Sequence, residues 1–294
     1  MNDQPKLVER LDHAQQQRPA AAFLVGVYRK FSDDRASRLG ALIAYYAFFS
    51  IFPAMLALVT ILGFVLQDNP SLRDDVQEGV LAQLPVIGDY VSDAAGRQLT
   101  GNTAALVIGV VTALWAGMGA MQASQDAMNT VWEVPRHEDP TFLAKRGRSM
   151  LMLLVMGGLL IGGSVLTQIA SNIGGVNVVA RAFLFVGTFA LNTLVLLVGY
   201  KVLMAESRPW RDFVPGAILA GVGYQILQLV GQLYVNRVLK GAQDVYGTFA
   251  TVIGLLSWLY LLSMNFLVGA EINVVAAKRL WPRRLTRKLD LRDA

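Results

Sequence analysis

The chain has 294 residues, of which 54% are hydrophobic and only 16% charged, and it carries a net charge of +5 with no cysteine. Soluble domains average about 25% charged residues, so this chain lacks the polar surface that a water-soluble protein requires. The composition excludes a disordered chain, a disulfide framework and chemistry that depends on cysteine, and it indicates an integral membrane protein.

Six long stretches without Asp, Glu, Lys or Arg follow one another along the chain, and the shortest has 19 residues. A helix needs about 20 mainly apolar residues to cross the hydrocarbon core of a bilayer, and lipid offers backbone polar groups no other partner. We therefore predict an all-α polytopic membrane protein with six transmembrane helices. The predicted spans cover residues 39–66, 103–122, 150–171, 180–203, 213–235 and 246–272.

The aqueous parts that flank this membrane domain of residues 39–277 are small. Residues 1–38 lack the pattern of a cleavable signal peptide, and the segment 23–28 predicts a helix lying at the membrane interface. The outer loop of residues 67–102 is acidic, and the tail of residues 278–294 is basic. We expect the loop to be a solvated connector, with a gate or a docking surface for a partner as the alternative.

The distribution of Lys and Arg predicts the orientation in the membrane. The N-terminal region and the C-terminal tail carry seven each, and the second and fourth loops carry four and three. The first, third and fifth loops carry two, one and two. Cytoplasmic loops are enriched in these residues, so both termini are expected in the cytoplasm. We interpret the basic residues as determinants of topology and contacts with anionic lipids, and we expect no nucleic-acid partner.

Uncharged polar side chains recur at helical spacing inside the predicted spans, where lipid would penalise them. Two interpretations remain open: each group forms a hydrogen bond to a neighbouring helix, or the groups line one shared polar cavity. Taken together, the polar stripes of several spans favour a cavity that includes Tyr46, Ser50, Asn192, Gln225 and Gln228.

The motifs of several enzyme classes are missing from the sequence. It contains no Gly-Lys dipeptide, as a phosphate-binding loop of an ATPase requires, and no Gly-x-Ser-x-Gly elbow of a hydrolase. His13 and His137 have no further histidine at metal-ligand spacing. We therefore expect no catalytic residue, no metal and no cofactor.

Three blocks of sequence resemble the YihY/BrkB family of membrane proteins. They are ALIAYYAFFSIFP at 41–53, LWA at 114–116 followed by Asn129 and Trp132, and YGTF at 246–249 followed by LLSWLY and GAEIN at 269–273. The resemblance covers roughly residues 20–280 and implies a six-helix protein of the bacterial cytoplasmic (inner) membrane.

The family motifs and the polar stripes together define the candidate site residues. These candidates are Tyr45, Tyr46, Ser50, Pro53, Gln122, Gln125, Asp126, Asn129, Asn192, Gln225, Gln228, Tyr246, Gly247, Ser257, Trp258, Tyr260, Glu271 and Asn273.

The resemblance also implies an association with the bacterial envelope, since members are linked to serum resistance and to envelope lipid export. An old ribonuclease BN label in the family fits this sequence badly, because neither metal ligands nor an RNA-binding surface is visible. The leading hypothesis is a transporter or flippase-like exporter of an amphipathic or lipid-like solute, in contact with membrane lipids. The alternative is an interaction or scaffold protein of the envelope that acts through its acidic outer loop. The sequence indicates no particular oligomeric state.

Overall fold

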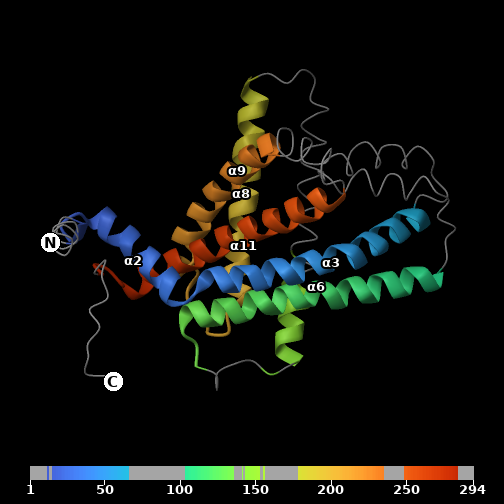
Figure 1. Ribbon diagram of the computed structural model, residues 1–294, viewed down its shortest axis with the longest axis horizontal. Helices are drawn as coiled ribbons and strands as arrows, with labels where there is room; N and C mark the ends of the chain where they lie inside the picture. The colour runs from blue at the N-terminus through green and yellow to red at the C-terminus, as the bar shows by residue number, and fades with distance from the viewer. Residues whose placement is uncertain are drawn as a thin grey trace.

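A computed structural model describes most of the helical part of the chain, and within the residues it describes there is no strand (Figure 1). The described residues are 12, 15–65, 103–135, 141, 143–152, 155, 178–234 and 248–283. Their helices are α2 (Pro19–Asp33), α3 (Ala36–Val65), α6 (Thr103–Trp132), a short helix over 143–152, α8 (Val178–Leu203), the 3₁₀ turn η3 (Trp210–Asp212), α9 (Val214–Tyr234) and α11 (Thr248–Lys278).

Five long helices overlap the first, second, fourth, fifth and sixth predicted spans. Two described segments, Phe185–Leu203 and Val252–Lys278, are long and apolar enough to cross a membrane, and Ala36–Ile51 is a shorter apolar helix. Most of the third predicted span and the whole outer loop lie outside the described residues. The number of spans therefore stays a prediction.

The helix that contains the second predicted span, residues 103–122, continues beyond that span. α6 runs without a break from Thr103 to Trp132. No Pro or Gly interrupts the segment between residue 122 and Trp132, so the polar residues remain on one continuous helix. The helix that was predicted at the membrane interface also forms, as α2.

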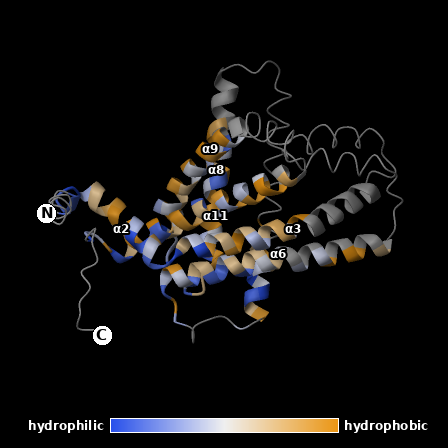
Figure 2. Ribbon diagram, in the orientation of Figure 1, coloured by the Kyte–Doolittle hydropathy of each residue, from blue (hydrophilic) through white to orange (hydrophobic). Residues whose placement is uncertain are grey.

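α11 is the central element of the described structure. It packs against α9, α3, α2 and α6, while α3 and α6 run side by side and α8 packs against α9 (Figure 1). Hydrophilic residues gather at the end where α2 lies and α11 terminates (Figure 2). This end also holds the largest buried side chains, with the rings of Trp132 and Phe213 in edge-to-face contact at 5.5 Å.

Glycines bring α9 and α11 into backbone contact. A Cβ atom added to Gly216 of α9 would lie 1.9 Å from the carbonyl oxygen of Gly269 in α11. A Cβ atom on Gly269 would in turn lie 2.1 Å from the hydroxyl of Tyr200 in α8. Small residues at such crossings allow membrane helices to approach closely, and this crossing fixes α8, α9 and α11 against one another.

Candidate functional site

Three helices end at one place and bring five charged residues together, which we call the charged junction: Lys30, Asp34, Glu133, Glu271 and Lys278. The residue that follows the end of α6 is Glu133, with a φ angle of 59°, and the residue that follows α11 is Arg279, with 52°. A left-handed residue after the last turn ends a helix. The turn after α6 satisfies the carbonyl oxygens of Asn129 and Thr130, and those of Val131 and Trp132 accept hydrogen bonds from other helices.

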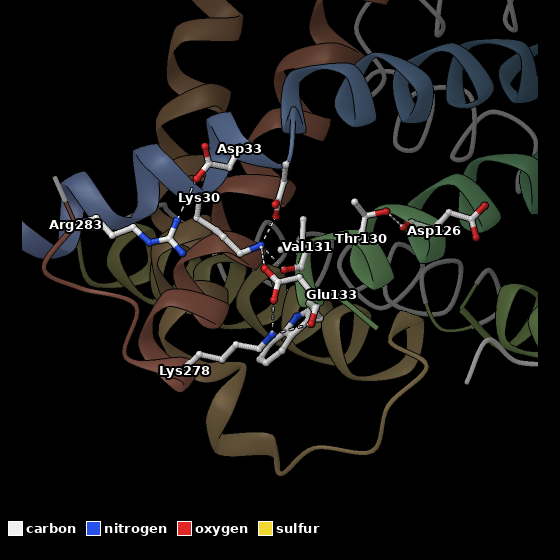
Figure 3. A network of polar contacts seen from close by, with 10 residues as sticks. Lys30, Asp33, Asp126, Thr130, Val131, Glu133, Lys278 and Arg283 are labelled. Carbon is white, nitrogen blue, oxygen red and sulfur yellow. Dashed lines mark hydrogen bonds and ion pairs between the residues drawn. The ribbon is translucent and has the colours of Figure 1, made fainter. Parts of the chain in front are cut away.

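Lys30 joins α2 to the end of α6. Its side chain is only 2% exposed, and its Nζ donates a hydrogen bond of 2.9 Å to the carbonyl oxygen of Val131. The same ammonium group forms an ion pair with Asp34. It forms a second one, at 3.2 Å, with Glu133 (Figure 3). A buried ammonium group needs such partners, and a cation at a helix C-terminus is favoured by the helix dipole.

Lys278 joins α11 to the end of α6 in the same way. Its Nζ donates a hydrogen bond of 2.9 Å to the carbonyl oxygen of Trp132 and lies 3.2 Å from a carboxylate oxygen of Glu133 (Figure 3). Two lysines from two other helices thus cap the C-terminus of α6. The junction therefore connects α2, α6 and α11 through polar contacts.

The carboxyl groups of Asp34 and Glu133 differ in their electrostatic environment. Burial raises the pKa of Asp34, and the Glu133 carboxylate adds to this, although the ammonium group of Lys30 acts in the opposite direction. For Glu133, partial burial acts to raise the pKa, but the ammonium groups of Lys30 and Lys278 outweigh it, so the pKa is lowered. Asp34 therefore accepts a proton at a higher pH than an ordinary aspartate does, whereas Glu133 stays ionised to a lower pH than an ordinary glutamate does.

Glu271, a candidate from the sequence, lies in the same junction on α11. It has no exposed surface, and neither of its carboxylate oxygens receives a hydrogen bond from a donor among the residues that the structure describes. Buried carboxylates normally have such donors, so this group has an unusual environment.

Asn273, the other candidate from the same motif, joins α11 to α9. Its Oδ1 accepts a hydrogen bond of 2.7 Å from the backbone N–H of Gly216, in the first turn of α9. The first N–H groups of a helix have no partner within the helix, so Asn273 caps α9 from outside. Asn265, about two helical turns earlier on α11, donates from Nδ2 to the carbonyl oxygen of Ala220 at 2.9 Å.

The polar stripe of α6 contacts the segments beside it. Gln125 donates to the hydroxyl of Ser149 at 2.8 Å, and Asp126 pairs with Lys145 at 3.0 Å. Asn129 accepts a hydrogen bond of 3.1 Å from the backbone N–H of Ala205. Hydrogen bonding to a neighbouring segment therefore accounts for these three candidates, and Gln122 is half-buried on the same helix.

The candidates of the first predicted span lie together on α3. Tyr45 is 53% exposed, its ring packs on Tyr46 and Phe49, and Tyr46 lies against Gly119 of α6. Ser50 donates to the carbonyl oxygen of Ala47 in its own helix. Pro53 lies within α3, beyond the residues whose side chains the structure describes.

A second group of polar residues, which we call the polar crossing, lies along α9 and on the parts of α8 and α11 that pack against it: Thr193, Tyr224, Gln225, Gln228 and Asn265. Thr193 of α8 lies against Gly221 and Asn265 of α11 against Gly223, whereas Gln228 is exposed. Gln228 donates from Nε2 to the hydroxyl of Tyr224 at 3.0 Å. The Oγ1 of Thr193 and the Nε2 of Gln225 are buried and have no hydrogen-bond partner among the described residues. Orphaned polar atoms of this kind indicate a place for water or for a polar group of a ligand.

The remaining described candidates lie in the middle of α8 and in the first half of α11. Asn192 and Tyr260 are half-buried and Ser257 is exposed, while the Trp258 ring lies against Gly231 of α9. Tyr246 and Gly247 lie outside the described residues. The structure thus distributes the candidates over the charged junction, the polar crossing and the α3–α6 surface rather than over one site.

Sequence reasoning did not single out Lys30, Asp34, Glu133, Lys278 or Thr193. Lys30 and Lys278 were counted only among the basic residues at the membrane border, and the spacing of Lys30 and Asp34, four residues apart on one helix face, was the available signal. Within the described ranges no three His, Asp or Glu side chains form a group that could hold a metal ion.

Long helices, two of them apolar and long enough to cross a membrane, and polar contacts between the helices are typical of a helical membrane protein. The family described as Virulence factor BrkB matches residues 27–292. The chain belongs to this family of membrane proteins, as the sequence motifs predicted.

Curated relatives extend over most of this chain. The putative ribonuclease-like protein YfkH of Bacillus subtilis is 24% identical, over 88% of this chain and 96% of its own length. The inner membrane protein YhjD of Escherichia coli is 23% identical, over 83% and 78%. A UPF0761 membrane protein of Alcanivorax borkumensis is 27% identical, over 85% of this chain and 59% of that protein. No solved structure matches the chain significantly.

Proposed function

We propose that this protein transports an amphipathic or lipid-like solute across the bacterial inner membrane, through the polar crossing of α8, α9 and α11. The observation that carries the proposal is the pair of orphaned atoms, Thr193 Oγ1 on α8 and Gln225 Nε2 on α9. A buried polar group without a partner is costly in a membrane helix. Water and the polar part of a passing solute would satisfy both atoms.

The chemistry of the crossing favours an amphipathic solute over a bare ion. α9 contains no charged residue, and α8 has charges only at Arg181 and Lys201, close to its two ends. Amide and hydroxyl groups among apolar side chains suit a solute that presents both polar and apolar surface. In this proposal the protein moves its solute without changing it chemically.

We further propose that both termini lie in the cytoplasm, which places the charged junction on the cytoplasmic side. The excess of Lys and Arg in the terminal regions and in alternate loops supports this orientation. Reporter fusions after residues 38 and 294 should report a cytoplasmic location, and a periplasmic location of either fusion would contradict the orientation.

Reconstitution into vesicles tests the transport proposal. Vesicles of phosphatidylethanolamine and phosphatidylglycerol carry a trace of fluorescent NBD-phosphatidylethanolamine, and dithionite reports how fast the probe crosses the bilayer. We expect the protein to accelerate crossing relative to protein-free vesicles. Combined Thr193→Val and Gln225→Leu substitutions should slow it about tenfold, which corresponds to roughly 1.4 kcal/mol of barrier.

Ile226→Leu is the matched control, because Ile226 is the exposed neighbour of Gln225 on α9. This variant should retain the rate of the unmodified protein. Equal rates in protein-containing and protein-free vesicles would refute transport of this probe, and equal rates in the double variant and its parent would exclude the polar crossing as its path.

A further inference from the structure

The proposed transport path does not explain why the carboxyl group of Glu271 is buried without a hydrogen-bond donor among the described residues. It is fully buried in α11, and no described N–H or O–H group donates to either of its oxygens. An isolated carboxylate in such a place would be strongly unfavourable, so the group must be either paired or neutral. The group that faces it is another carboxyl, Asp34.

The Asp34 carboxyl group at the end of α2 faces Glu271 where α2 packs against α11, and no described donor is hydrogen-bonded to either Glu271 oxygen. Two ionised carboxylates are both acceptors and repel each other, whereas a carboxyl and a carboxylate form a strong hydrogen bond around one shared proton. The contact between α2 and α11 at this point therefore requires a proton.

The charge balance of the junction also requires one bound proton. Among the residues that the structure describes, the carboxyl groups of Asp34, Glu133 and Glu271 face two ammonium groups, those of Lys30 and Lys278. Arg283 also acts on Glu271, but it is paired with Asp33 at 3.3 Å. One bound proton leaves two negative charges opposite two positive charges.

The other elements packed against α11 do not change this balance. α9 has no charged residue, and Arg38, the only charged residue of α3, is exposed. Asp126 of α6 is paired with Lys145, and Arg211 of η3 lies at 3.8 Å from Asp212.

We infer that Asp34 and Glu271 form a proton-binding site, in which one proton held between the two carboxyl groups closes α2 onto α11. In the closed state the O–H of one carboxyl group donates to the carboxylate of the other. On release, that O–H bond breaks, its electron pair stays on the carboxylate, and the proton passes to water. The two carboxylates then repel each other, and the α2–α11 contact opens.

In this proposal the bound proton is the ion that is coupled to movement of the solute. Opening and closing of α2 against α11 moves α11, and α11 contacts α9 through the hydrogen bond between Asn273 and Gly216. This role of the proton in solute movement rests on the proposed transport function, whereas the existence of the proton site does not.

Infrared spectroscopy of the full-length protein in lipid nanodiscs tests the site directly. At neutral pH we expect the C=O stretching band of a protonated carboxyl group, which should be absent from Glu271→Gln and shifted in frequency in Asp34→Asn. Glu206→Gln, which removes a carboxylate outside the junction, is the matched control and should leave the band unchanged. A missing band in the parent protein, or a band that survives in Glu271→Gln, would overturn the inference.

Glu133→Gln provides a second readout that a purely structural role would not produce. It removes one negative charge from the junction, so the remaining two carboxylates balance the two lysines without a proton. The protonated-carboxyl band should therefore lose intensity at neutral pH in this variant. An undiminished band would contradict the charge balance on which the site depends.

A pH gradient across the vesicles tests whether proton binding at Asp34 and Glu271 is coupled to transport, independently of whether the proton site exists. We expect the gradient to change the rate of probe crossing at least about threefold in the parent protein and to have no effect on Glu271→Gln. If the band behaves as expected and the gradient has no effect, proton coupling is wrong and the site stands. If no probe crosses in any sample, the proposed function fails while the spectra still decide the site.

Discussion

Lys30, near the end of α2, donates a hydrogen bond of 2.9 Å to the carbonyl oxygen of Val131, 101 residues further along the chain in the last turn of α6. Together with the hydrogen bond from Lys278 to Trp132, this contact caps α6 from two neighbouring helices. The charged junction therefore acts as a polar core at the end of an otherwise apolar helical structure, and its integrity can be tested residue by residue.

Replacing Lys30 with Met should destabilise the protein by about 3 kcal/mol, because Asp34 and the Val131 carbonyl would remain buried without their partner. Lys278→Met is the matched control. The Lys278 side chain is 26% exposed, so water can replace its contacts and the loss should be about 1 kcal/mol. Unfolding of the detergent-solubilised proteins with increasing SDS measures both values, and equal losses would contradict the buried role of Lys30.

Gly216→Ala should prevent α9 from packing correctly on α11. Its Cβ would lie 1.9 Å from the Gly269 carbonyl oxygen and 2.6 Å from the Asn273 side chain, and the first of these atoms belongs to a backbone that cannot rotate away. We expect loss of the folded protein in size-exclusion chromatography and thermal unfolding.

Gly147→Ala controls for the effect of the substitution itself. Gly147 lies in the short helix over 143–152, and an added Cβ would meet no atom within 4 Å. This variant should be unchanged or more stable by up to about 1 kcal/mol, because alanine favours a helix over glycine. A stable, normally folded Gly216→Ala protein would show that the close crossing does not hold α9 and α11 together.

Asp34→Asn and Glu133→Gln should alter the pH dependence of stability in opposite directions. The pKa of Asp34 is raised from its ordinary 3.8, so its contribution is fully present below that pH and is lost as the pH rises through the folded-state value. The pKa of Glu133 is lowered from its ordinary 4.5, so its contribution is present above that pH and is lost as the pH falls through the folded-state value.

Denaturation at a series of pH values between about 3.5 and 7 checks these signs. The stability of the parent protein relative to Asp34→Asn should fall as the pH rises, whereas its stability relative to Glu133→Gln should increase. If the two stability differences changed with pH in the same direction, this would contradict the electrostatics of the junction.

The helices could be predicted from the sequence because a charge-free apolar stretch has few other structures available. α6 extends past the predicted membrane span to Trp132, because the polar residues after Gln122 include no helix breaker. The partners of Asn129 and Asn273 are backbone N–H groups of Ala205 and Gly216, distant in sequence. A polar stripe predicts that a helix has a partner, but not which one.

The charged junction was harder to predict for a physical reason. Lys30 and Lys278 look like any lysine at a membrane border, and only the folded arrangement shows that both cap α6. Glu271 was identified through its motif, but its contact with Asp34 depends on how α2 packs against α11. Such contacts between distant segments are set by tertiary packing and leave no periodic pattern in the sequence.

The most direct test of the central claim is the water accessibility of the polar crossing. The chain has no cysteine, so single substitutions at Thr193, Gln225 and Ile226 each introduce one thiol into the full-length protein. Only an ionised, hydrated thiol reacts quickly with a charged, membrane-impermeant reagent. If the crossing is a path for polar groups, cysteine at positions 193 and 225 should be labelled in membranes, while cysteine at 226 on the outer face of α9 should remain unlabelled. If the thiols at 193 and 225 are as unreactive as that at 226, the crossing is dry and the proposed transport path is wrong.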